Sequence, residues 1–125
     1  TQAPMYSLIC FCTQCQTIGG GFGVGSVIVP AAALQVEEGS EQLTDLVLKG
    51  SKTGVVRRFC SACGTHVLAS NPAQPMTAVH SGTLDDSAAF KPQVAIWCKS
   101  MRPHHRLPEG LPHFDEYPPP AQSQC

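Results

Sequence analysis

The sequence predicts a mainly β, antiparallel fold in a single domain, and three observations support this prediction. Short runs of β-branched and aromatic residues alternate with turn signals along most of the chain. The 125 residues include 11 glycines and 11 prolines, a frequency that leaves little room for long helices. Five of the seven cysteines fall in two tight clusters, at residues 10–15 and 60–63, with spacings typical of metal ligands.

Taken in order along the chain, six segments are expected to form the strands. Each combines β-branched or aromatic residues with glycine, proline or polar residues at its ends. They are residues 26–30, 46–48, 55–59, 65–70, 77–82 and 93–97. Pro30 and the alanines after it predict one helical turn, because proline favours the first position of a helix. The glycine-rich residues 16–25 form either a flexible lip beside the first cluster or a set of tight turns.

The second cysteine cluster lies between two of these predicted strands. One predicted strand enters it at Phe59 and another leaves it at Thr65, so the cluster lies at the tip of a hairpin. Gly64 follows the last sulfur, where the backbone of such a turn needs a permissive residue.

Size and charge restrict the classes of function. A chain of this length is expected to form one domain with a small core, and we place that domain at residues 1–117. Residues 118–125 begin with three prolines and are expected to form a disordered tail. The net charge of −1 and the scattered basic residues argue against a nucleic-acid partner, and no apolar run is long enough to span a membrane. An odd number of cysteines at metal-ligand spacings favours bound metal over disulfides, and with it a cytoplasmic location.

The first cluster predicts a catalytic zinc site, one with an open coordination position. Cys10, Cys12 and Cys15 lie within six residues, so their sulfurs can converge on one Zn²⁺. Three protein ligands leave a fourth position for water or substrate, which is the catalytic pattern. Such a site suits chemistry on a thiol, a thiol adduct or a carbonyl that the metal can polarise.

A second arrangement of the sulfurs is the one that spacing alone favours, because it needs no residue that the chain lacks. Cys60 and Cys63 can meet Cys12 and Cys15 in a closed four-sulfur site, which leaves Cys10 outside it. That arrangement predicts a structural zinc and a non-catalytic interaction module.

Five landmarks, taken in order, resemble the glutathione-dependent formaldehyde-activating enzyme family, to which centromere protein V belongs. The resemblance runs from about Ile9 to Tyr117. The landmarks are Cys10-x-Cys12-x-x-Cys15, Phe59-Cys60-x-x-Cys63-Gly64-Thr65, Gly82-Thr83-Leu84-Asp85-Asp86, Ile96-Trp97 and Leu111-Pro112-x-Phe114.

This resemblance implies a zinc-bearing, β-tent-like fold with two metal sites. It places a catalytic zinc on Cys10, Cys12 and Cys15, and half of a structural zinc site on Cys60 and Cys63. The other half is a C-x-C on an N-terminal strand; since no cysteine precedes Cys10 here, that strand is expected to be missing. An uncovered sheet edge would favour pairing of two subunits into a homodimer.

The resemblance also implies an activity. The family joins formaldehyde to glutathione to give S-hydroxymethylglutathione, a carbon–sulfur lyase reaction. We therefore expect a zinc-dependent enzyme that acts on a small thiol adduct or carbonyl, with glutathione as the expected partner. The alternatives are a zinc lyase, dehydratase or hydrolase of the same fold acting on another small metabolite, and the non-catalytic module.

Histidines are the candidates for proton transfer, since their pKa lies near neutrality. His80 precedes the Gly82–Asp86 stretch and is expected to point into the same cleft as that stretch, so it joins the three cysteines as a catalytic candidate. His104 and His105 are either a ligand or proton donor on a segment that covers the site, or solvated loop residues.

Overall fold

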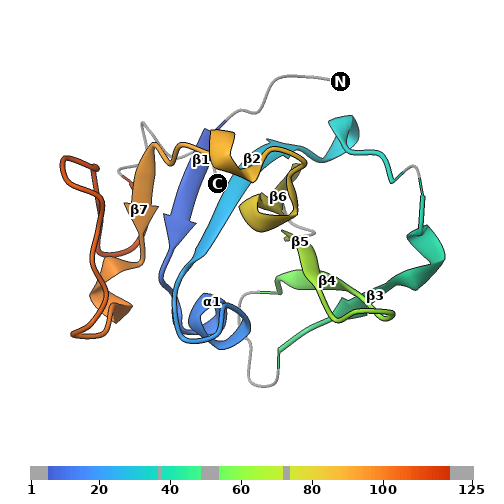
Figure 1. The fold of residues 1–125 in the computed structure, drawn as a ribbon, viewed down its shortest axis with the longest axis horizontal. Helices are drawn as coiled ribbons and strands as arrows, with labels where there is room; N and C mark the ends of the chain where they lie inside the picture. The colour runs from blue at the N-terminus through green and yellow to red at the C-terminus, as the bar shows by residue number, and fades with distance from the viewer. Residues whose placement is uncertain (1–5, 37, 49–53, 72–73, 119–125) are drawn as a thin grey trace.

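The computed structural model describes residues 6–36, 38–48, 54–71 and 74–118 (Figure 1). Within these ranges the fold is mainly β: the strands form one sheet, in which antiparallel pairs dominate, and the single α-helix is short. The predicted fold class is therefore confirmed. None of the described helices is long and apolar enough to cross a membrane. Residues 119–125 of the predicted tail lie outside the described residues, whereas Pro118 is buried.

The sheet brings distant parts of the chain side by side. Its strand order is β3-β4-β5-β6-β2-β1-β7. All neighbours are antiparallel except β1 and β7, which run parallel. The strands are β1 Tyr6–Cys10, β2 Val24–Pro30, β3 Leu43–Leu46, β4 Val56–Cys60, β5 His66–Ser70, β6 Met76–His80 and β7 Val94–Ile96, and the helix is α1 Thr13–Ile18.

Most of the predicted elements are present. Five of the six predicted strands correspond to β2, β4, β5, β6 and β7, and the helical turn after Pro30 is the 3-10 turn Ala31–Ala33. The prediction of a strand at residues 46–48 is wrong, because β3 ends at Leu46 and Val47 is 55% exposed. β3 is an edge strand paired only with β4, so its residues need less of the apolar, β-branched pattern by which a strand is predicted from sequence.

Two elements beside the first cysteine cluster were not predicted. β1 lies inside the sheet between β2 and β7, and Cys10 is its last residue. α1 begins after Cys12, whose Sγ accepts a hydrogen bond from the Cys15 N–H at 3.4 Å. It ends at Gly19, whose N–H donates to the Cys15 carbonyl oxygen. The glycine-rich segment is thus the end of α1, a tight turn and the start of β2.

The core lies on one face of β1, β2 and β7. Leu8, Ile28, Val94 and Ile96 pack together there and are each at most 6% exposed. Beyond β7 the C-terminal segment continues the sheet: Trp97 N–H donates to the carbonyl of residue 116, and residue 114 N–H donates to the carbonyl of residue 95. Figure 1 shows this segment, in orange and red, running beside β7. The β7 edge is therefore covered by backbone pairing.

Candidate metal centre and adjoining cavity

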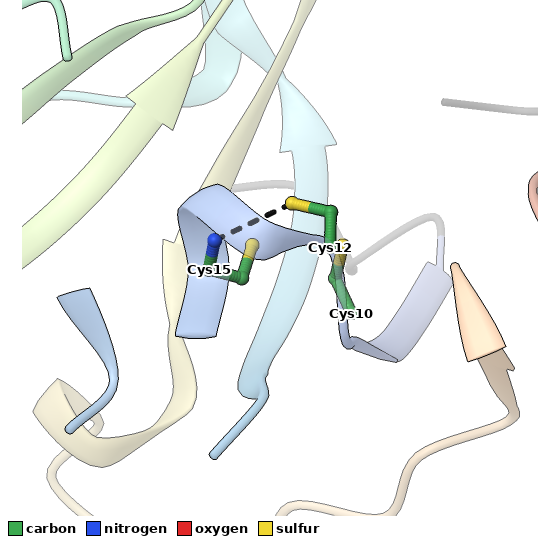
Figure 2. A group of neighbouring side chains, drawn as sticks. All are labelled: Cys10, Cys12 and Cys15. Atoms are coloured by element: carbon green, nitrogen blue, oxygen red, sulfur yellow. Dashed lines mark hydrogen bonds between the residues drawn. The ribbon is translucent and has the colours of Figure 1, made fainter. Parts of the chain in front are cut away.

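The three cysteines of the first cluster come together in space. Their Sγ atoms all lie within 4.8 Å of one another (Figure 2). Cys10 ends β1, Cys12 caps α1 and Cys15 lies in the first turn of that helix. Cys15 is buried and the other two are partly buried. The strand-to-helix turn therefore presents all three sulfurs to one point.

The electrostatics of the cluster favour negative charge on one sulfur, that of Cys12, and raise the pKa of the other two thiols. Hydrogen bonds from Cys10 and then Cys15 lower the pKa of Cys12 to about 2, and the positive charge of Arg57 contributes in the same direction. The pKa of Cys10 is raised, first by its hydrogen bond to Cys12. Three converging sulfurs, one of them stabilised as a thiolate, form a donor set suited to Zn²⁺. The cluster could therefore hold a metal ion.

The second cluster stands apart from the first. In the described part of the chain, Cys10, Cys12 and Cys15 form the only group of three or more potential ligands that converge within 4.8 Å. The closed site made of Cys12, Cys15, Cys60 and Cys63 is therefore not formed. The reason is the length of β4: Cys60 is three residues beyond Arg57, which reaches the first cluster, and a strand rises about 3.3 Å per residue.

The hairpin tip itself is built as the sequence predicts. Cys60 N–H donates to the Thr65 carbonyl at 2.8 Å, and Gly64 adopts φ +79° in the turn between β4 and β5. Cys63 is exposed, and its Sγ lies 3.2 Å from Thr65 Oγ1. A structural zinc on Cys60 and Cys63 stays a prediction.

A cavity of about 330 Å³ opens beside the first cluster. Cys10, Cys12 and Cys15 all contribute to its wall. Much of the remaining wall is apolar and comes from the central strands and the segment after β7, and includes Leu8, Ile28, Met76, Ile96 and Trp97. A cavity of this size and lining suits a small organic molecule.

His80 lies in the wall of the same cavity, whereas the Gly82–Asp86 stretch that follows it does not. It is the last residue of β6 and is 8% exposed. Burial, followed by the positive charge of Arg57 and the neighbouring His66, lowers the pKa of His80 to about 4. His80 is therefore neutral near pH 7 and able to accept a proton.

Arg57 is the residue of the site that the sequence reasoning missed. It lies on β4, is only 4% exposed and lines the cavity. Its Nη2 donates to Gln14 Oε1 at 3.1 Å, while its buried Nε has no hydrogen-bond partner. The signal was the pair Arg57-Arg58 in a predicted strand: successive side chains point to opposite faces, so one arginine had to face inward. The other, Arg58, forms an exposed ion pair with Asp45.

His105 has a structural role, whereas its neighbour His104 lies at the surface. His105 is buried, its Nδ1 accepts the Arg102 N–H at 3.0 Å, and its Nε2 lies 2.8 Å from the Gly21 carbonyl oxygen. Nε2 therefore carries the proton and ties the glycine turn to the C-terminal segment. His104 packs against Phe22 and is exposed. Neither histidine lines the cavity. His105 is therefore neither a ligand or proton donor that covers the site nor a solvated loop residue.

Comparisons with known proteins agree with this fold. The family model described as glutathione-dependent formaldehyde-activating enzyme matches residues 1–100. The crystal structure of a Rhodobacter sphaeroides protein superimposes with a TM-score of 0.55 at 19% identity, covering 70% of this chain and 80% of that chain. At that identity the likeness concerns the fold alone. A search of curated proteins found no match.

Proposed function

Since this chain belongs to the glutathione-dependent formaldehyde-activating enzyme family, we propose that it is a zinc-dependent enzyme joining a small thiol to a small aldehyde. The observation that carries the proposal is the convergence of three cysteine sulfurs at the wall of a cavity that His80 also lines. A site serving only to stabilise the fold would have no need of an adjoining cavity. Glutathione and formaldehyde are the substrate pair that the family's description names.

Cys10, Cys12 and Cys15 would hold the zinc. The metal, when bound by three protein sulfurs, acts as a Lewis acid that keeps a substrate thiol deprotonated at neutral pH. The cysteines fix its position because Cys10 is anchored at the end of β1 and the other two by the first turn of α1.

His80 supplies a group that can move a proton. In the reaction a carbon–sulfur bond forms between the thiol and the carbonyl carbon, and the thiol proton ends on the carbonyl oxygen. The His80 imidazole is neutral near pH 7, accepts that proton at a ring nitrogen and returns it to the oxygen. The apolar wall limits water around the reacting atoms, which strengthens these polar interactions.

The test measures zinc and turnover on the same samples. Exchange NMR with ¹³C-formaldehyde and glutathione reports how fast the free aldehyde and the S-hydroxymethyl adduct interconvert. We expect the protein to bind zinc at the first cluster and to accelerate this exchange. Cys10→Ser should remove both, and His80→Asn should lower the rate by roughly 100-fold or more while zinc is retained.

Cys98 offers a matched control. It is partly buried, stands outside the cluster and is not among the cavity-lining residues, so Cys98→Ser should keep both zinc and activity. Exchange at the uncatalysed rate in zinc-loaded protein would refute the proposed reaction. Full activity in Cys10→Ser would refute the assigned site.

A further inference from the structure

Within the described residues, no acidic side chain pairs with the charge of Arg57. The described ion pairs are Arg58 with Asp45 and Lys99 with Glu116, both at exposed positions. Among the described residues that line the cavity there is no aspartate or glutamate, and Arg57 is the one with a permanent charge. A cation that is 96% buried without a carboxylate partner is costly, and the thiolate charge of the cysteine cluster balances it only at a distance.

The hydrogen bonds of Arg57 are also incomplete. A guanidinium has five N–H donors arranged as a planar fork. Gln14 Oε1 is the one acceptor within hydrogen-bond distance in the described part of the chain, and Nε is buried with none. The planar fork matches a carboxylate, which accepts two parallel hydrogen bonds from it.

From these observations we infer that Arg57 is a specificity-determining residue that binds the carboxylate of the substrate thiol in this cavity. The inference rests on the proposed function and deepens it: the substrate class is a small thiol that also carries a carboxylate. The thiol reaches the three cysteines and the carboxylate reaches Arg57, so one molecule spans the cavity. An uncharged thiol lacks the second anchor.

One competing role for Arg57 makes a different prediction. The charge of Arg57 acts on the cysteine cluster, so the arginine could serve only to balance the charge of the metal and its thiolates. Charge balance acts through space and leaves the buried Nε–H of Arg57 without an acceptor, whereas a carboxylate satisfies both needs. In the charge-balance case, Arg57 would influence every thiol equally.

Matched pairs of ligands separate the two roles. The probes are N-acetylcysteine and its primary amide, which differ in charge, and the S-methyl forms of both, which have no free thiol. Trp97 lines the cavity and is the one tryptophan of the chain, so its fluorescence reports binding, with calorimetry as a second measurement. We expect the zinc-loaded protein to bind each acid on the order of 10-fold more tightly than its amide, as a charge-assisted hydrogen-bond pair implies.

Variants then test whether Arg57 causes the preference for the acid over the amide. Arg57→Gln should reduce the acid-to-amide ratio to near one and leave the affinity for the amides unchanged, whereas Arg57→Lys should keep part of the ratio. Arg58→Gln, on the neighbouring outward-facing position, should keep all of it. Equal affinities of the unmodified protein for acid and amide would overturn the inference without any variant. An Arg57→Gln protein that weakens acid and amide alike would also overturn it, in favour of charge balance.

The S-methyl pair keeps this result separate from the proposed function. If the protein holds no zinc or leaves aldehyde exchange unchanged but still prefers the S-methyl acid through Arg57, the proposed reaction is wrong and carboxylate recognition stands. If zinc and exchange are as expected and the preference is absent, only the carboxylate inference is wrong.

Discussion

Acidification should destabilise this fold through His80, and the size of the effect follows from its environment. The ordinary histidine pKa is 6.5, whereas burial, Arg57 and His66 lower the pKa of folded His80 to about 4. Between these values the unfolded chain binds a proton that the folded chain excludes, so stability falls as the pH falls. The contribution is fully present above pH 6.5, reduced by about 2 kcal/mol at pH 5, and reduced by about 3 kcal/mol below pH 4.

Urea unfolding followed by Trp97 fluorescence at several pH values measures this loss. The comparison is between the unmodified protein and His80→Asn in metal-free buffer, because other titrating groups then contribute equally to both. The variant should show a weaker pH dependence, with the difference reaching about 2 kcal/mol at pH 5. Identical pH dependence of the two proteins would show that burial and the charge of Arg57 do not lower the pKa of His80 in the folded protein.

Three further predictions concern the packing that positions the site. Leu68→Ala removes a core side chain that is 3% exposed and should lower the free energy of unfolding by about 2–5 kcal/mol in denaturant titrations. Gly23→Ala would place a Cβ 2.7 Å from the Cys10 carbonyl oxygen, so it should cost about 1–3 kcal/mol and weaken zinc binding, whereas Gly82→Ala meets no atom within 4 Å and should change neither. His105→Phe removes two partly buried hydrogen bonds to backbone groups and should raise the hydrogen exchange of the glycine turn, with a loss of about 1–3 kcal/mol. Unchanged exchange there would contradict the role of His105 in holding this turn to the C-terminal segment.

The parts of the molecule that could be predicted from sequence depend on neighbours in the chain. The cysteines at positions 10, 12 and 15 are close enough along the backbone that a single turn brings their sulfurs together. The β4–β5 hairpin joins consecutive strands through a short turn with a glycine at positive φ, and its residues carry that signal themselves. The error at residues 46–48 arose where the signal is weakest, since β3 has a partner on one side only.

Composition and local spacing thus determined a small β fold with a sulfur cluster suited to a metal. Only the tertiary structure decided that Cys60 and Cys63 stay away from that cluster, and that Arg57 shares one cavity with the cluster and with His80. The physical reason is register: β4, β5 and β6 are paired so that residues more than forty positions from the cluster face it, and Arg57 of β4 contacts Gln14 of α1. The neighbouring residues of Arg57 indicate only that one of two arginines faces inward; which part of the fold it faces depends on the packing of the whole sheet.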